Sequence, residues 1–304
     1  MLDLIIYIKS DGANATPDSL EKTISSIEET IGNVNYKYYF VLNKTQKQAV
    51  LEFVKSGLLT QEKILTTKAS VASWALEFNI FFNTHKDSTK YILTSHDDLI
   101  IRTKDFFNLS MDLVKGKEKE IGWITFTCDT YYRDFDRPWG VSARMGFAKD
   151  RHKWPFIYEC HNFNASHNGK AKENLHLLDM PDSGRLVKIH APYSVLNLVS
   201  TDSMKIIGPC EDWTAYTMLI DEDWGLEALK NNLWNIWIPD IYYTHPLKEH
   251  PNRWMKEGHA GFTKKWGFCH GKESEKDIEM IRRKYKDTLI PWSSYHNTYD
   301  WQYL

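Results

Sequence analysis

The first hundred residues alternate between short apolar runs and amphipathic segments, and this alternation constrains the fold more than any other feature. The apolar runs lie within residues 4–8, 38–42, 63–66 and 91–93. Continuous runs of this length are typical of strands that are covered on both faces. Strands that alternate with helices predict an α/β fold with a mostly parallel sheet and right-handed crossovers.

The segment after the first apolar run carries a clear helix signal. Thr16 is a suitable N-cap and Pro17 fits the first helical position. Apolar side chains then recur with helical spacing and so share one helix face, at Leu20, Ile24, Ile27 and Ile31. Two further helices are expected at 46–54 and 70–83, and the second should bury Trp74, Phe78 and Phe81. The sequence contains neither a glycine-rich dinucleotide fingerprint nor a P-loop motif.

Composition excludes several classes of protein. The chain has 304 residues, of which 42% are hydrophobic, so it can bury a core as one large domain or two smaller ones. The formal net charge of −2 argues against non-specific binding to nucleic acid, which needs a basic surface. No apolar run approaches the ~20 residues of a membrane span. The N-terminus lacks the basic region of a signal peptide, and the four cysteines form no CxxC pair, so we expect a cytoplasmic protein.

An acidic turn follows the fourth apolar run. Ser95 and His96 lead into the adjacent carboxylates Asp97 and Asp98, and a second apolar run begins at once at Leu99. Open α/β sheets bind ligands at the carboxyl ends of their strands. Two carboxylates beside a histidine suit a divalent cation that prefers oxygen ligands. Asp is also common in surface turns, so a plain turn between two strands is the alternative.

Two more polar signals lie downstream. The acidic run 221–223 opens a segment whose apolar spacing predicts a helix that continues through Leu233 and Trp234. Carboxylates at a helix start either cap the helix or, if they reach a hydroxyl, can act as a general base. A strand after this helix ends in His245. An imidazole there can ligate a metal or donate to phosphate, and a structural strand-end histidine is the alternative.

Taken in order, these elements resemble a GT-A glycosyltransferase of the family 2 type. The resemblance covers roughly residues 2–128 and 195–245. It implies an α/β fold of the GT-A type, a Rossmann-like nucleotide-diphospho-sugar transferase with a mixed sheet flanked by helices. The acidic turn stands at the family's DxD motif, but Ser95 replaces its first Asp. Asn43 stands where the second strand usually ends in acidic residues.

The resemblance also implies roles for individual residues. The donor nucleotide and its diphosphate would contact Ile8, Lys9, Ser10, Asn43, Ser95, His96 and Asp98. Mn²⁺ or Mg²⁺ would be held by Asp97, with help from Asp98 one position further on, and by His245. Asp223, or failing that Glu222, would be the catalytic base of an inverting transfer. The donor would be a UDP- or GDP-type nucleotide sugar and the acceptor a glycan or another hydroxyl compound.

Two regions fall outside the resemblance. Within a catalytic domain of residues 1–245, the polar and aromatic stretch at about 129–190 is either an insertion that shapes the acceptor side or a variable excursion packed on the sheet. Residues 246–304 would form a lid and packing extension. There we expect a loop over the nucleotide at 258–271, with Arg253, Lys264 or Lys265 at the diphosphate and aromatic residues that suit docking against a second subunit.

Two other functional classes stay open at this point. One is a catalytically inactive relative that binds glycans or nucleotide sugars, which the incomplete acidic motif favours. The other is a nucleotidyltransferase on a similar sheet. That enzyme should carry a basic glycine-rich loop after the first strand, and the segment 9–12 contains one glycine.

Overall fold

The structure is a computed structural model. It describes residues 1–9, 16–43, 52, 54–67, 74–128, 187–189, 192, 195–211, 220–245 and 255–266. In chain order the main elements are β1 (Leu2–Lys9), α1 (Pro17–Thr30), β2 (Tyr36–Asn43), β3 (Ile64–Thr67), α3 (Trp74–His85), β4 (Thr89–His96), β5 (Ile100–Ile101), α4 (Phe106–Val114), β6 (Ile121–Cys128), β7 (Val187–Ile189), β8 (Leu196–Ser200), α6 (Thr201–Ile207), α7 (Ile220–Lys230), β9 (Trp234–Thr244) and α8 (Met255–Trp266). Short 3₁₀ turns, Gln61–Lys63 and Glu118–Glu120, precede β3 and β6.

The strands form one mixed sheet in the described part of the chain. Its order is β3-β2-β1-β4-β8-β6-β9-β5, and β7 also pairs with β9. The first four strands pair in parallel, which confirms the prediction from the alternating pattern. β8 runs antiparallel between β4 and β6. The sheet is therefore mixed rather than fully parallel.

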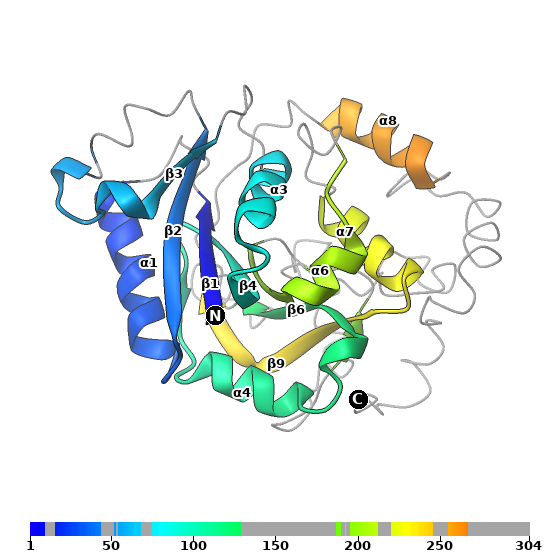
Figure 1. Cartoon of the computed structure of the whole chain (residues 1–304), viewed down its shortest axis with the longest axis horizontal. Helices are drawn as coiled ribbons and strands as arrows, with labels where there is room; N and C mark the ends of the chain where they lie inside the picture. Colours follow the sequence, from blue (N-terminus) through cyan, green and yellow to red (C-terminus); the bar gives the residue numbers. More distant parts are fainter. Residues whose placement is uncertain are drawn as a thin grey trace, which may run out of the picture.

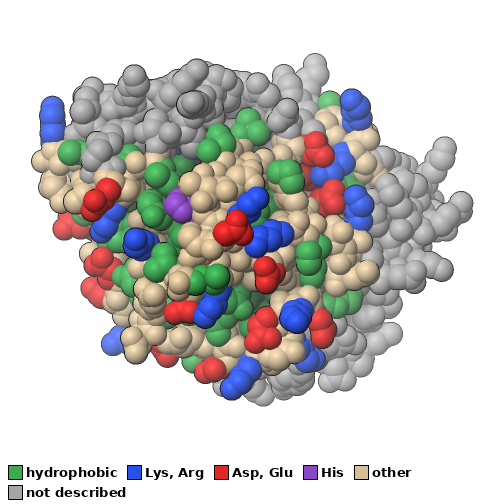
Figure 2. All heavy atoms as spheres, viewed as in Figure 1, with side chains coloured by type: hydrophobic (Ala, Val, Ile, Leu, Met, Phe, Trp, Pro, Cys, Tyr) green, Lys and Arg blue, Asp and Glu red, His purple; other side chains and the backbone are tan. Residues whose placement is uncertain are grey.

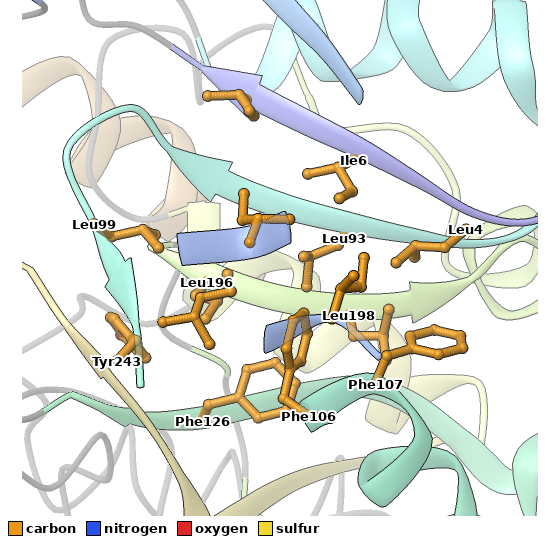
Figure 3. Close-up of a cluster of buried hydrophobic side chains, with 14 of the residues drawn as sticks. Leu4, Ile6, Leu93, Leu99, Phe106, Phe107, Phe126, Leu196, Leu198 and Tyr243 are labelled. Atoms are coloured by element: carbon orange, nitrogen blue, oxygen red, sulfur yellow. The ribbon is translucent and has the colours of Figure 1, made fainter. Parts of the chain in front are cut away.

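Helices cover both faces of this sheet (Figure 1). On one face, α1 and α4 pack against apolar side chains of β1, β4, β8 and β6. Figure 3 shows this core, with Phe106 and Phe107 of α4 next to Leu93 and Leu198 of adjacent strands. On the other face, α3, α6 and α7 pack on a second core.

Aromatic rings dominate the second core. Phe78 of α3 contacts Tyr7 of β1 edge-on, with ring centroids 5.4 Å apart, and Trp224 of α7 at 5.0 Å. Trp224 in turn stacks on Trp123 of β6 at 4.6 Å. Buried aromatic pairs in these geometries add stabilisation beyond their apolar area. This chain of rings fixes α3 and α7 to the same face of the sheet.

The helix predicted after β1 begins where the sequence indicated. Thr16 accepts a hydrogen bond from the backbone of Ser19, and the side chain of Ser19 accepts one from the backbone of Thr16, which forms a capping box. Pro17 occupies the first turn. Leu20, Ile24, Ile27 and Ile31 are all buried.

The helix predicted to reach Trp234 ends earlier. α7 stops at Lys230, and Asn232 has a left-handed φ of 60°. The amide of Leu233 then donates to the carbonyl oxygen of Ala228 at 2.9 Å, a bond that closes the helix end. Asn tolerates this conformation better than other non-glycine residues, so the Asn231–Asn232 pair is the stop signal. Trp234 instead begins β9.

The loop expected at 258–271 was also wrong in its first part, because residues up to Trp266 belong to α8. Phe262 and Trp266 are both buried, and their spacing of four places them on one helix face. Within the stretch 129–190, Val187–Ile189 forms β7 and pairs with β9. The rest of that stretch, most of the helix predicted at 46–54, Ser10, Arg253 and the chain after Trp266 lie outside the described residues.

The face of the molecule shown in Figure 2 mixes acidic and basic side chains. Within the described helices, none combines the length and the apolarity that crossing a bilayer requires.

Candidate functional site

Three polar side chains meet at the carboxyl ends of β4 and β9. His96 is the last residue of β4, Asp98 lies in the turn after it, and His245 directly follows β9. Nε2 of His245 lies 3.1 Å from Oδ1 of Asp98. The imidazole rings of His96 and His245 have centroids 5.2 Å apart. One potential ligand atom from each of the three residues lies within 4.8 Å of the others.

Strand pairing explains why residues so distant in sequence meet here. β1 and β4 pair in parallel with Lys9 opposite His96, so both strands end at the same edge of the sheet. The short β5 pairs antiparallel with β9, with Ile100 opposite Thr244. Asp98 therefore lies just before β5, and His245 just after the segment of β9 that β5 pairs with. The two side chains are brought together by backbone pairing next to them.

The three side chains form a donor set that a divalent metal can use. Two imidazole nitrogens and a carboxylate, close together and largely shielded from solvent, suit Mn²⁺, Fe²⁺ or Zn²⁺. Mg²⁺ is a poorer match because it prefers oxygen ligands in an octahedral arrangement. These residues therefore fit a metal ion.

The structure distinguishes the two adjacent aspartates. Asp98 belongs to the histidine cluster, whereas Asp97 is buried in the same turn and lies outside the cluster. Asp97 was predicted to be the principal ligand and Asp98 the helper. Of the two carboxylates, Asp98 is the one that lies 3.1 Å from Nε2 of His245. The role of Asp97 as a metal ligand stays a prediction.

The other residues expected to contact the donor nucleotide have varied environments. The ammonium group of Lys9 is buried and forms an ion pair with Glu77 of α3. Ile8 and Ser95 are fully buried, and the hydroxyl of Ser95 donates to the carbonyl oxygen of His96 at 2.8 Å. The backbone of Asn43 ends β2, while its side chain and all of Ser10 lie outside the described part.

Asp223 lies in the first described turn of α7, under α8. Its Oδ1 atom accepts a hydrogen bond from Nε1 of Trp266 at 2.9 Å and lies 2.7 Å from Nζ of Lys265. Lys265 also pairs with Glu227 at 3.0 Å and reaches Glu211 at 3.7 Å. One cation thus joins three carboxylates at this point of the fold.

Burial and charge act in opposite directions in this cluster. Burial raises the pKa of Asp223 above its ordinary value, although Lys265 and the Trp266 hydrogen bond lower it in part. Burial lowers the pKa of Lys265, but the neighbouring Asp223 and Glu227 carboxylates outweigh that effect and the pKa is raised. A carboxylate with a raised pKa is a stronger base than an exposed one. The side chain of Glu222 lies outside the described part.

Sequence reasoning missed how α8 meets the acidic cluster. Lys264 or Lys265 was expected at the diphosphate, but Lys265 pairs with Asp223. The helical spacing of Phe262 and Trp266 was the available signal. A second missed contact is Asn79 of α3, whose amide bonds both the N–H and the C=O of Cys210 at 2.9 Å. This contact fixes the loop that carries Glu211 toward Lys265.

Comparison with known proteins finds a similar structure but no similar sequence. The chain matches no known protein-family model and no curated protein sequence. Its structure is similar to that of S. aureus TarS, residues 1–349, crystallised in complex with UDP-GlcNAc. The TM-score is 0.53 at 12% sequence identity, and the match covers 95% of this chain and 72% of that one. The chain has a GT-A-like fold. At this level of identity the likeness establishes the architecture alone, a mixed sheet with helices on both faces.

Proposed function

We propose that this chain transfers a sugar from a nucleotide-diphosphate donor to an acceptor hydroxyl with the help of a divalent cation. The observation that carries the proposal is the His96–Asp98–His245 cluster, which lies at the carboxyl edge of the sheet. Open α/β sheets bind their ligands at this edge. The likeness to a protein crystallised with UDP-GlcNAc supports a nucleotide sugar as the ligand.

The metal ligands we propose are His96, Asp98 and His245, with Asp97 as a further carboxylate in the same turn. A cation bound there would neutralise charge on the diphosphate and act as a Lewis acid. The two imidazoles favour Mn²⁺ over Mg²⁺. Ile8, Lys9, Ser10, Asn43 and Ser95 are the proposed nucleotide side of the site, with Lys9 held in place by Glu77.

Asp223 is the proposed base, and Glu222 is the second candidate. The Oδ1 atom of Asp223 is held by Lys265 and Trp266, whereas Oδ2 has no hydrogen-bond partner among the described residues. Oδ2 would take the proton of the acceptor hydroxyl. The acceptor oxygen then bonds to the anomeric carbon, and the nucleoside diphosphate leaves with the bonding electron pair. Attack from the face opposite the leaving group inverts the configuration.

The proposal is tested by ligand-induced stabilisation. A panel of UDP- and GDP-sugars is screened by thermal unfolding with and without Mn²⁺, followed by assays of sugar release to water and to hydroxyl acceptors. A ligand at 100 times its Kd stabilises the folded state by about 2.7 kcal/mol. We expect one donor to stabilise the protein in the presence of Mn²⁺, and His245→Asn to abolish the Mn²⁺-dependent part.

His85→Asn is the matched control, because His85 is a half-buried histidine on α3 whose ring centroid lies 4.7 Å from that of Tyr39. Its Mn²⁺ dependence should equal that of the unaltered protein. The proposal is wrong if no nucleotide sugar stabilises the chain in either condition. Binding without sugar release to water or to any acceptor would instead identify an inactive nucleotide-sugar-binding protein.

A further inference from the structure

Helix α1 carries hydroxyl side chains on its buried face. Thr23 is completely buried, and Ser26 and Thr30 are nearly so, among the apolar side chains that pack on the sheet. A hydroxyl in such a place is unfavourable unless it forms a hydrogen bond. Two of these three residues form that bond with a different part of the chain.

The partner of both is the backbone around β5. Oγ1 of Thr23 donates to the carbonyl oxygen of Leu99 at 2.8 Å. Oγ of Ser26 accepts from the amide of Ile101 at 3.1 Å and itself donates to the carbonyl oxygen of Thr23 at 2.8 Å. Thr30 differs, because its hydroxyl bonds to the carbonyl oxygen of Ser26 within the helix.

These contacts occupy the edge of β5 that faces away from β9. β5 is the last strand in the sheet order, and the backbone groups of alternate residues in a strand point to opposite edges. On the β9 side, Ile100 pairs with Thr244 and the amide of Arg102 donates to the carbonyl oxygen of Tyr242 at 2.8 Å. On the other side, Leu99 and Ile101 bond to α1. The hydroxyls of α1 therefore take the place of a neighbouring strand.

We propose that Thr23 and Ser26 are positioning residues for the His96–Asp98–His245 cluster. The inference rests on the proposed metal site and adds the hydrogen bonds that set the geometry of that site. Asp98 directly precedes Leu99, whose carbonyl oxygen is the acceptor for Thr23. Because β5 spans two residues, few ladder bonds hold it, and the two bonds from α1 are a large share of its anchorage. Loosening them frees Asp98 to move away from His245.

Metal sites are sensitive to displacements of this kind. Ligand distances must be met to within about 0.2 Å, and loss of a residue that orients a ligand typically weakens metal binding about 10- to 100-fold. Thr23→Val keeps the shape of the side chain and removes the hydroxyl. We expect it to weaken Mn²⁺ binding by about tenfold or more, measured by electron paramagnetic resonance of free Mn²⁺ during titration of the full chain.

Thr30→Val is the matched control, with the same substitution on the same helix face, and its Mn²⁺ affinity should stay that of the unaltered chain. Thr23→Ser keeps the hydroxyl and should restore tight binding. Ser26→Ala removes the second hydroxyl without adding bulk and should also weaken Mn²⁺ binding. If Thr23→Val fails to fold, the Mn²⁺ affinities of Ser26→Ala and Thr23→Ser test the positioning role instead.

The outcomes distinguish a failure of the metal site from a failure of the positioning role. If the unaltered chain binds no Mn²⁺, the proposed metal site itself is wrong. If the unaltered chain binds Mn²⁺ but Thr23→Val and Ser26→Ala bind it as tightly as Thr30→Val, the positioning role is overturned and the metal site stands. A loss of thermal stability without a loss of Mn²⁺ affinity also overturns it, because it would show a purely structural role.

Discussion

Replacing Lys265 by Met tests how the acidic cluster under α8 is stabilised. The substitution keeps an unbranched side chain of similar length and removes a cation that pairs with Asp223 at 2.7 Å and with Glu227 at 3.0 Å. Asp223 is almost completely buried, so its charge would be left without compensation. Removing one partner of a fully buried ion pair costs about 3–5 kcal/mol.

The expected loss for Lys265→Met lies at the lower end of that range. Lys265 is 17% exposed and Glu227 is 15% exposed, so water reaches part of the cluster. We expect the free energy of unfolding to fall by about 3 kcal/mol at pH 8. At about 2 °C per kcal/mol for a chain of this size, the melting temperature should fall by about 6 °C.

The loss should depend on pH with a definite sign. Burial raises the pKa of Asp223 in the folded protein, and Lys265 partly offsets that effect. Without Lys265 the folded-state pKa rises further. A group whose folded pKa is raised contributes stability that is present below its unfolded pKa and is lost as pH rises through its folded pKa. The deficit of the variant should therefore be smaller at pH 5 than at pH 8, because acidification brings the pH toward the raised folded-state pKa of Asp223.

The measurement is urea unfolding at both pH values, with Lys264→Met as the control. Lys264 is the exposed neighbour on the same helix, and substitutions at such positions change stability by less than about 0.5 kcal/mol. The reasoning is refuted if the two variants are equally stable at pH 8. A deficit of Lys265→Met that stays constant or grows on acidification would refute the pH argument.

Two further substitutions examine the proposed base and the packing beneath it. Asp223→Asn removes the basic oxygen, so sugar transfer should fall by at least about 10²-fold while Mn²⁺ and donor binding stay unchanged; retention of full turnover would exclude Asp223 as the base. Gly122→Ala would place a Cβ atom 2.8 Å from Cβ of Ala228 and 3.0 Å from Oδ1 of Asn235, which forces β6 and α7 apart. The free energy of unfolding should fall by about 1–3 kcal/mol in urea titrations, and an unchanged value would mean that the two elements approach less closely.

The amino-acid pattern predicted local structure best where the signals are local. The N-cap at Thr16 and the apolar face of α1 depend on neighbours within a few residues, and both were predicted from Thr16 and the spacing that follows. The acidic turn after β4 was likewise visible as two carboxylates after an apolar run. Its place at the carboxyl edge of the sheet follows from the parallel pairing of β1 and β4.

The identity of the carboxylate next to His245 was not predictable. Asp97 and Asp98 are adjacent and chemically equal, and what separates them is the path of the chain into β5. That path is set by pairing with β9 and by the hydroxyls of α1, both far away in sequence. The contact of Lys265 with Asp223 was not predictable either, because it depends on how α8 docks on α7.

The irregular pairing of β9 has a consequence for how this protein tolerates changes in chain length. Between the pairs Phe126–Ile238 and Thr127–Tyr242, β9 advances by four residues while β6 advances by one. β6 pairs with β9 on both sides of this irregularity, while the other partner of β9 changes from β7 before Pro239 to β5 after it. Side chains alternate along a strand, so deleting or adding one residue at this bulge would turn His245 to the opposite side of the strand. At about 3.3 Å per strand residue, Pro239 lies about 20 Å along the chain from His245. The insertion or deletion of one residue there should still damage the site more than most substitutions next to the site.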